Sequence, residues 1–292
     1  MSIVTEKINQ NTVDIDLLNG AEIARLINEE DKKISSAVET EIPAIGAVIE
    51  KSAQRLAQGG RMAYFGSGTS GRIGILDASE MASTFGVDEN LVQGFISGGQ
   101  KAIRFAVEGA EDSVDCARAD LNAFMPTAKD VVIVLSASGN PLYGVEILKQ
   151  ARQRGALTVA ICSNPEAKFK QYADIFICAL VGAEAIVGSS RMKAGTAQKM
   201  IVNMISTGVM IKLGKVYHNY MVDLQISNQK LQQRAVRFVC EICGVDTNTA
   251  EKYLAQAKNV KTACVMIKKN CSLIEAQHLL EQNGGVLRRV IG

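Results

Sequence analysis

Five short apolar runs mark the middle of the chain. They are Met62–Phe65, Val92–Ile96, Val131–Leu135, Leu157–Cys162 and Ile175–Leu180. Each run has the length of a strand and is mainly apolar rather than alternating, with Gln93 and Thr158 as the polar residues, as is typical of strands buried on both faces of a parallel sheet. Segments with helical spacing separate several of them, such as Leu142–Arg154, which ends at Gly155. The pattern predicts βαβ units, and hence a doubly wound α/β domain with a parallel sheet over residues 60–235.

Helical patterns flank this region on both sides. In residues 1–59, apolar side chains recur at helical spacing until the Gly59–Gly60 pair, which predicts an N-terminal helical segment. Residues 236–292 return to that spacing and are predicted to form a small C-terminal helical domain. Within it, Ser272 and Glu275 have the spacing of a helix capping box, and Asp246 is a candidate cap.

Composition and charge narrow the classes of function. Of the 292 residues 47% are hydrophobic, and 32 Lys and Arg residues oppose 30 Asp and Glu residues for a formal net charge of +2. Without a basic cluster, so small a charge predicts no nucleic-acid partner. The longest uncharged stretch, Val131–Val145, contains polar residues such as Ser136 and Asn140. We therefore expect no membrane span and no membrane partner.

The cysteines and the N-terminus predict a cytoplasmic protein. Residues 1–10 are charged and lack an apolar secretory core. Seven cysteines, an odd number, are too few for a disulfide scaffold in a chain this long and fit a reducing compartment. Cys240 and Cys243 form a lone CxxC within a helical pattern, so they are predicted to be small core residues rather than a redox or metal site.

Two loops rich in glycine and hydroxyl side chains follow the first and third apolar runs. They are Gly66–Arg72 and Ser136–Asn140. In an open α/β sheet, ligands bind beyond the carboxyl ends of the strands, where these loops are expected. Glycines let backbone N–H groups converge on an anion, hydroxyls donate further hydrogen bonds, and the N-terminus of the following helix adds positive potential. Together the two loops predict a sugar-phosphate site.

The first loop also has the bare G-x-G-x-x-G spacing, at Gly66, Gly68 and Gly71. No acidic residue ends the next strand about 20 residues later, where the ribose of a dinucleotide would need one. No G-K-[ST] follows, which excludes a Walker A loop. We therefore expect no nucleotide cofactor.

Charged side chains accompany these loops. Asp77 and Glu80 lie on the helix that the first loop opens, and the cluster Glu108–Asp112 lies beyond the second apolar run. A third segment, Gly188–Lys199, combines small residues, hydroxyls and three cations. Carboxylates on helices are usually solvated, so position alone gives neither acidic cluster a catalytic role.

Four segments together carry a family resemblance. They are Gly66–Arg72, Leu76–Glu80, Ala106–Asp112 and Gly188–Lys199. With them the chain resembles the N-acetylmuramic acid 6-phosphate etherase family, whose core is a sugar isomerase (SIS) domain. Further matches are Thr5, Glu6, Asn9, Thr12, Ile15 and Asp16 near the start, and Gly214–Val216, Asn219 and Met221–Asp223 later. The resemblance covers nearly the whole chain.

The resemblance implies a lyase of cell-wall sugar recycling. Such an enzyme removes the D-lactyl ether from C3 of N-acetylmuramate 6-phosphate with water, giving N-acetylglucosamine 6-phosphate and D-lactate. By motif, Glu80 is the expected proton donor and Glu111 the second acid–base residue. The expected substrate-binding residues are Ser67, Thr69, Ser70, Ser136, Ser138, Ser190, Arg191 and Lys193, with Arg72 as a further cation. A homodimer, and neither a metal nor another cofactor, are also implied.

Two carboxyl groups suit this chemistry. The open-chain sugar has an aldehyde at C1 that acidifies the C2 proton, so one carboxylate can abstract that proton while a carboxylic acid protonates the departing lactyl oxygen. Water then adds at C3. Each positioned proton transfer is worth about 10² to 10⁴ in rate.

The chain departs from the family pattern in two places. Where the family usually has Ala-Ser-Gly-Arg-Thr-Pro after the third strand, Asn140 replaces the Arg, and Pro141, which cannot donate a hydrogen bond, replaces the Thr that often binds phosphate. After Glu80, Met81–Thr84 replaces the usual Cys-Pro-Pro-Thr. Two alternatives stay open: a sugar-phosphate-binding regulator without turnover, resembling glucokinase regulatory protein, and an aldose–ketose isomerase, which shares the C2 deprotonation.

Overall fold

The computed structural model describes residues 6–292, so Thr5 of the N-terminal motif lies outside the described residues. The sheet consists of β1 (Met62–Gly66), β2 (Val92–Ile96), β3 (Val131–Leu135), β4 (Leu157–Cys162) and β5 (Ile175–Cys178). Every strand coincides with a predicted apolar run, and all neighbouring strands are parallel. β5 ends before Leu180, whose side chain is 53% exposed. The doubly wound α/β prediction is confirmed.

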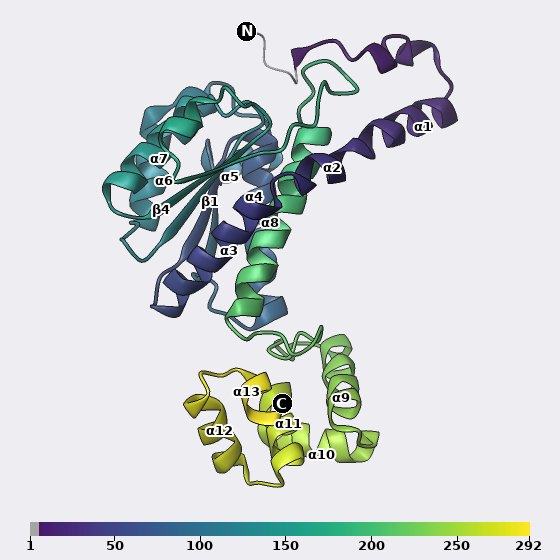
Figure 1. The fold of residues 1–292 in the computed structure, drawn as a ribbon, viewed down its shortest axis with the longest axis vertical. Helices are drawn as coiled ribbons and strands as arrows, with labels where there is room; N and C mark the ends of the chain where they lie inside the picture. Colours follow the sequence, from purple (N-terminus) through teal and green to yellow (C-terminus); the bar gives the residue numbers. More distant parts are fainter. Residues whose placement is uncertain (1–5) are drawn as a thin grey trace. The chain divides into compact units, whose positions relative to one another are not determined.

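The order of the strands creates a switch point. It is β2-β1-β3-β4-β5, so β1 pairs with β2 on one side and with β3 on the other (Figure 1). Phe65 of β1 is opposite both Phe95 of β2 and Val134 of β3. The chain moves outward from β1 to β2, then returns and moves the other way through β3, β4 and β5. A crevice opens at the carboxyl ends of β1 and β3, where this direction reverses.

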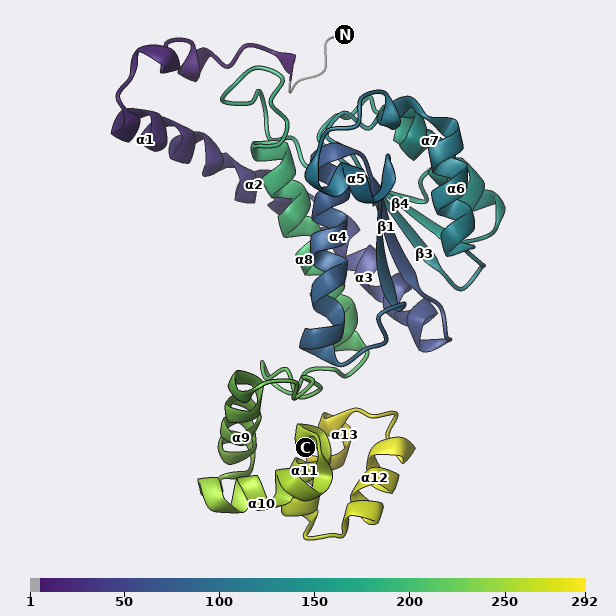
Figure 2. The ribbon, with the colours of Figure 1, turned by 180° about the vertical axis from the view of Figure 1, so that it is seen from behind.

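Helices cover both faces of the sheet (Figures 1 and 2). One face carries α6 (Val114–Phe124) and α7 (Leu142–Gln153), and the other carries α3 (Ile42–Ala57), α4 (Gly68–Phe85) and α8 (Lys193–Lys212). Strand side chains alternate between them: Phe65 joins the core under α6 and α7, whereas Tyr64 contacts Gly74 of α4. The inner strands β1, β3 and β4 are buried along their whole length, and Thr158 is the one polar residue among them. The edge strands β2 and β5 are only partly buried, and β2 includes Gln93.

A buried aspartate connects three of these elements. Asp77 of α4 accepts a hydrogen bond from the Tyr64 hydroxyl of β1 at 2.8 Å. It also accepts one from Asn203 Nδ2 of α8 at 2.7 Å and one from the Ser206 hydroxyl at 3.1 Å. Burial raises the pKa of Asp77, although these hydrogen bonds oppose the rise. Asp77 therefore braces α4 against β1 and α8.

An N-terminal arm, residues 6–39, precedes α3. It contains two 3-10 helices (Gln10–Thr12 and Ile15–Leu17), followed by α1 (Gly20–Asp31) and α2 (Lys33–Glu39). Its first part lies beside the loop of residues 179–192, which leads into α8 (Figures 1 and 2). Asn9 donates a hydrogen bond to the Ala183 carbonyl at 3.1 Å, and Thr12 donates one to the Ala185 carbonyl at 2.8 Å. The arm is thus tied to the 179–192 loop.

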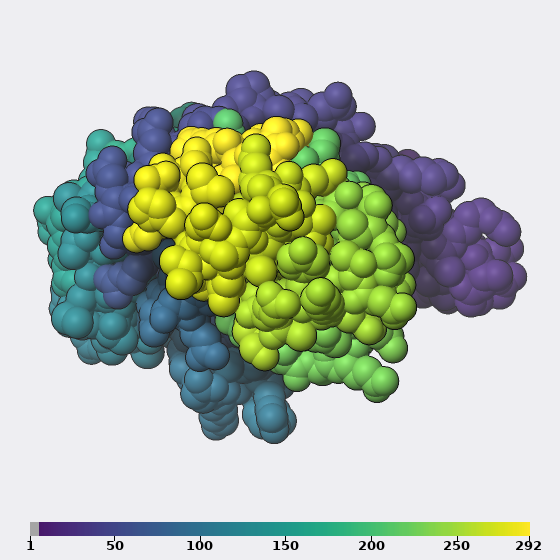
Figure 3. Space-filling view, turned by 90° about the horizontal axis from the view of Figure 1, so that it is seen from below, coloured from purple at the N-terminus to yellow at the C-terminus, as the bar shows by residue number. Residues whose placement is uncertain are grey.

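The chain divides into two compact units, each with most of its contacts inside itself. The first consists of Met1–Ser79 and Asn90–Ser206, and the second of Glu80–Glu89 and Thr207–Gly292. The second unit contains α9 (Gln229–Cys243), α10 (Thr247–Ala257), α11 (Val260–Lys269), α12 (Leu273–Gln282) and α13 (Leu287–Ile291), drawn in green to yellow in Figure 3. The sequence-based boundaries at residues 59 and 235 stay a prediction.

The helices of the second unit begin and pack as the sequence predicts. Ser272 and Glu275 form a complete capping box on α12, and the Asp246 carboxylate accepts the Thr249 N–H at the start of α10. Cys240 and Cys243 of α9 pack against the apolar core of this unit, as expected for small core residues.

Over residues 6–292, none of the helices combines the length and the apolar character needed to cross a bilayer. Within that same range, no group of three His, Cys, Asp or Glu side chains is arranged to hold a metal ion.

Candidate active site

A cavity of about 330 Å³ lies at the switch point between β1 and β3, and we call it the serine pocket. Its lining consists of Glu6, Ser67, Gly68, Thr69, Ser70, Glu111, Ser136, Ala137, Ser138, Pro141 and Ser190. These residues bring six hydroxyl groups and two carboxylates to one space. The structure thus places Glu111 and every predicted hydroxyl residue around a single cavity, although they come from segments far apart in the sequence.

One wall is the turn from β1 into α4. The N–H of Ser70 donates to the Ser67 carbonyl at 3.1 Å and closes the first turn of the helix. Gly71 allows the close packing of this turn, because a Cβ there would lie 2.6 Å from both the Gly66 carbonyl oxygen and the Ile96 side chain. The free N–H groups at the start of α4 and the hydroxyls of the loop are therefore available to an anion.

The facing wall is the loop after β3. The Ser136 hydroxyl accepts a hydrogen bond from the Gly139 N–H at 3.0 Å, and the Ser138 hydroxyl accepts one from the Asn140 N–H at 3.3 Å. A hydroxyl has one proton and two acceptor lone pairs, so each serine that accepts a bond from its own loop keeps its proton to donate. The two hydroxyls also lie 3.5 Å from each other, so one of them can donate to the other while its neighbour keeps its proton for a ligand in the serine pocket.

The departure from the family pattern lies in the same loop. Pro141 lines the serine pocket but has no N–H or hydroxyl to offer. Asn140 does not replace it, since its side chain does not line the serine pocket and its Oδ1 accepts the Lys168 N–H at 3.0 Å. This wall therefore has fewer donors than the family pattern implies.

Glu111 lies where the serine pocket meets a second cavity. That cavity measures about 180 Å³ and shares Ser67, Gly68 and Glu111 with the serine pocket. The 3-10 helix Ala110–Asp112 carries Glu111, and the left-handed Gly109, with φ +72°, precedes it. A ligand that extends from one cavity to the other would pass the Glu111 carboxylate.

Arg72 lines the second cavity rather than the serine pocket. Its guanidinium donates to the carbonyls of Ala102 at 2.8 Å and Ile103 at 2.9 Å, near the end of α5 (Gly99–Arg104). These bonds fix the cation beside the cavity. Arg72 therefore offers positive charge to a ligand group near Glu111.

Two other predicted cations lie outside both cavities. Arg191 is exposed and does not line either of them. Lys193 is 1% exposed, and its ammonium donates to the Glu30 carboxylate of the N-terminal arm at 2.7 Å. The structure thus gives Lys193 a protein partner, and its predicted contact with the substrate stays a prediction.

The start of α8 differs from the start of α4. The Glu184 carboxylate accepts the N–H groups of Lys193 at 2.8 Å and Ala194 at 2.9 Å. Burial raises the pKa of Glu184, and these two N–H groups oppose the rise. Because the protein's own carboxylate occupies this helix terminus, these two N–H groups are not available to a ligand.

Glu80, the expected proton donor, is exposed and does not line the serine pocket. It lies on α4 more than three turns after Gly68, at about 3.6 residues per turn. Leu76, one turn before it on the same face of the helix, is 52% exposed although it is apolar. The structure therefore does not bring Glu80 and Glu111 together within one chain's serine pocket.

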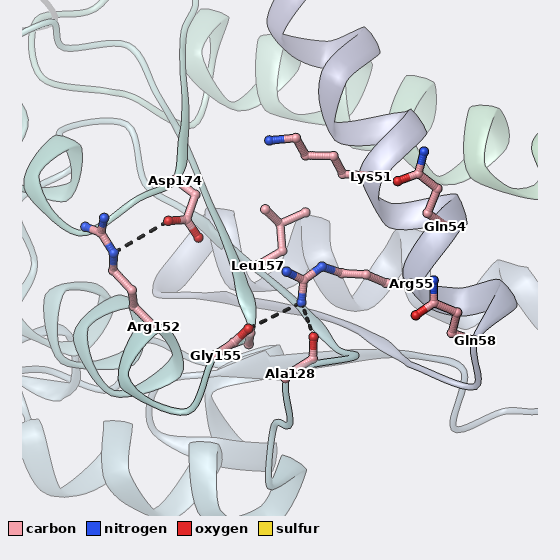
Figure 4. A pocket seen from close by; sticks show the side chains of 10 residues that line it. Lys51, Gln54, Arg55, Gln58, Ala128, Arg152, Gly155, Leu157 and Asp174 are labelled. Atoms are coloured by element: carbon pink, nitrogen blue, oxygen red, sulfur yellow. Dashed lines mark hydrogen bonds and ion pairs between the residues drawn. The ribbon is translucent and has the colours of Figure 1, made fainter.

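A larger cavity, of about 660 Å³, lies at the amino ends of the strands (Figure 4). Its two arginines are occupied by protein groups: Arg55 donates to the carbonyls of Ala128 and Gly155, and Arg152 pairs with Asp174 at 3.5 Å. Open α/β sheets bind ligands at the other end. The smaller serine pocket is accordingly the better candidate.

Comparisons with known proteins identify the domains of the chain. Residues 44–150 match the N-terminal SIS domain of glucokinase regulatory protein, residues 118–207 match the SIS domain, and residues 218–259 match the C-terminal lid domain of glucokinase regulatory protein. A phosphoheptose isomerase from Neisseria gonorrhoeae aligns with a TM-score of 0.48 and 15% identity, over 65% of this chain and 97% of that chain. By its family matches, the protein is a SIS-domain protein.

Full-length relatives define the family more narrowly. The chain is 49% identical to the N-acetylmuramic acid 6-phosphate etherase of Caldanaerobacter subterraneus, over 99% of this chain and 95% of that protein. It is 47% identical to the enzyme of that name from Escherichia coli O139:H28, over 99% of this chain and 97% of that protein. The chain belongs to the N-acetylmuramic acid 6-phosphate etherase family, and the resemblance seen in its motifs is confirmed.

One charged residue of the serine pocket was not among the predicted site residues. Glu6 lines the serine pocket from the N-terminal arm. Its only signal in the sequence is membership of the N-terminal part of the family resemblance. No local pattern could place it there, because the first strand begins only at Met62.

Proposed function

We propose that this protein is a cytoplasmic lyase that removes D-lactate from N-acetylmuramate 6-phosphate with water and leaves N-acetylglucosamine 6-phosphate. One observation carries the proposal: Glu111 borders a pocket of hydroxyl donors in a chain 49% identical, over nearly its full length, to an etherase of that name. The pocket supplies donors for a phosphate and a carboxylate for proton transfer.

The serine pocket is the proposed phosphate site. Hydroxyls from both loops and the free N–H groups at the start of α4 would bind the phosphate oxygens. The sugar would extend past Glu111 toward the second cavity, where Arg72 offers a positive charge to the lactyl carboxylate. In this orientation C2 and C3 lie near Glu111.

Elimination followed by addition accounts for the reaction. The Glu111 carboxylate takes the C2 proton of the open-chain sugar, and the electron pair expels the lactyl oxygen from C3. Glu80, as a carboxylic acid, gives that oxygen its proton. Water then adds at C3 of the unsaturated aldehyde, and C2 recovers a proton.

A homodimer is proposed to supply Glu80. Glu80 of one chain does not line that chain's serine pocket, yet the reaction needs an acid and a base at one substrate. The exposed face of α4 that carries Glu80 also carries Leu76, which is 52% exposed and would be buried if a second copy covered this face. The Glu80 of the second copy would then complete the site.

Mixed dimers test this arrangement. Glu80→Ala and Glu111→Ala chains, each inactive alone, are co-expressed with different tags. In a symmetric dimer with random pairing, half of the dimers are mixed and each has one intact site, so about one quarter of the wild-type activity should return. Each variant paired with itself is the control. If the purified mixed dimer releases no D-lactate, Glu80 does not act across the dimer.

The reaction itself is tested in isotopic water. Wild-type protein incubated with N-acetylmuramate 6-phosphate should release D-lactate. In D₂O the sugar product should carry deuterium at C2, and in H₂¹⁸O it should carry the label at C3, because both bonds are remade from solvent. Direct displacement at C3 would leave the C2 proton in place. Binding of the sugar phosphate without release of lactate would instead favour a regulator. A ketose product that retains its lactyl group would favour an isomerase.

A further inference from the structure

We infer that Glu6 contacts the sugar part of the substrate and accepts a hydrogen bond from one of its neutral donors, a hydroxyl or the acetamido N–H. The inference rests on the proposed function and adds to it a residue that orients the substrate. Glu6 lines the serine pocket together with Ser67, Ser136 and Glu111, so a ligand bound to the serines meets its carboxylate.

The base of the N-terminal arm is fixed by a buried ion pair. Glu30 is 2% exposed and accepts hydrogen bonds from the Lys193 ammonium at 2.7 Å and from Asn9 Nδ2 at 2.8 Å. Lys193 is the first residue of α8, so this pair connects the arm to the α/β unit. Asn9 is buried and lies three residues after Glu6. The arm is therefore held close to the point at which Glu6 enters the pocket.

The 179–192 loop gives the Glu6 carboxylate its place. Gly188 has φ +74°, and a Cβ at this position would lie 3.0 Å from Glu6 Oε2. The carboxylate thus lies against the backbone of Gly188, which has no side chain. Ser190, two residues further along the chain, also lines the pocket. A glycine with a left-handed φ leaves room here that no other residue would.

The charge of Glu6 suits a sugar and not a phosphate. A carboxylate accepts hydrogen bonds from neutral donors and repels a phosphate or a second carboxylate. The hydroxyl donors of the pocket have the opposite preference. The two kinds of group in one pocket therefore favour one orientation of a sugar phosphate, with its phosphate at the serines and its neutral hydroxyl or amide donors at Glu6.

Binding measurements test this role with three ligands: N-acetylglucosamine 6-phosphate, glucose 6-phosphate and inorganic phosphate. Glu6→Ala should raise the Kd of N-acetylglucosamine 6-phosphate by about 10- to 100-fold, as expected for loss of a hydrogen bond to a charged acceptor. Glu6→Gln keeps an acceptor oxygen and should lose less. The Kd of inorganic phosphate should not rise. If Glu6→Ala loses the same factor of affinity for both sugar phosphates, the donor to Glu6 is a hydroxyl. If it loses more affinity for N-acetylglucosamine 6-phosphate, the donor is the acetamido N–H.

Two glycines of one loop give a matched pair of variants. Gly188→Ala places a methyl group against the Glu6 carboxylate, whereas Gly182, with φ +75°, would have nothing within 4 Å of its added Cβ. Both substitutions carry the same backbone strain. Gly188→Ala requires the Glu6 carboxylate to shift, so it should weaken sugar phosphate binding, but by less than Glu6→Ala does. Gly182→Ala should leave binding within about threefold of wild type.

The outcomes separate this inference from the proposed function. If the wild type releases no D-lactate, the proposed function fails. If the wild type is active and Glu6→Ala binds both sugar phosphates as tightly as the wild type does, the inference is overturned. It is also overturned if inorganic phosphate loses affinity by the same factor, because Glu6 would then only support the loop.

Discussion

Glu111→Gln should lower kcat for lactate release by about 10² to 10⁴ and leave the Kd of N-acetylglucosamine 6-phosphate nearly unchanged. The amide has the shape of the carboxylate but cannot take a proton from C2. Glu111 lies at the border between the serine pocket and the second cavity, away from the proposed phosphate site. The substitution should therefore leave the binding of the sugar phosphate intact. Steady-state kinetics and calorimetric binding of the product measure the two quantities separately.

Asp112→Asn is the matched control for this experiment. Asp112 is in the same 3-10 helix, is exposed, and lines neither the serine pocket nor its neighbour. Its kcat should stay within about twofold of wild type, as is usual for an exposed surface substitution. If Glu111→Gln keeps more than a tenth of the wild-type kcat, Glu111 is not the base, and the elimination needs another group.

Lys193→Met should lower the free energy of unfolding by about 2 to 3 kcal/mol, because the Glu30 carboxylate loses its buried cation and keeps only the half-exposed Lys33 as an ionic partner. Both side chains of this pair are almost fully buried, at 2% and 3% exposure. Thermal unfolding followed by calorimetry should show a midpoint lower by about 10 °C. Lys32→Met is the control, since the pair of Lys32 with Glu29 is exposed and its loss should cost under about 1 kcal/mol.

The loss of stability in Lys193→Met should depend on pH, because the protonation of Glu30 determines whether the ion pair exists. Burial by itself raises the pKa of Glu30, but hydrogen bonds from Lys193, Lys33, Asn11 and Asn9 outweigh it and hold the pKa well below the usual 4.5. A lowered pKa means that the pair stabilises the fold above about pH 4.5 and that this contribution is lost as the pH falls further. The gap between the wild type and Lys193→Met should therefore narrow in acid. A gap that widens below pH 4.5 would contradict the ion pair as its cause.

Local rules of sequence predicted the parts of the site that depend on the sheet. Buried strands carry few polar side chains, so all five were visible as mainly apolar runs such as Val131–Leu135. The loops after the first and third strands could be placed in one crevice, because ligands of such sheets lie at the carboxyl ends. Both hydroxyl loops do line one pocket.

The rest depended on contacts that no local pattern encodes. Lys193 resembles a surface cation in the sequence, yet its partner is Glu30, a separation of 163 residues. Glu6 reaches the serine pocket because hydrogen bonds hold the N-terminal arm against the 179–192 loop. Periodicity reports which face of an element is buried, but not which distant charge it meets there.

The walls of the serine pocket come from five separate stretches of the chain, and for this reason the supply of substrate affects the stability of the fold. Glu6, the loop after β1, Glu111, the loop after β3 and Ser190 meet only in the finished α/β unit. A partly folded chain has no complete binding site, so a sugar phosphate binds the native state alone. At a hundred times its Kd, such a ligand adds about 2.7 kcal/mol to the stability of the native state. The protein should therefore resist heat and proteolysis best when its ligand is plentiful.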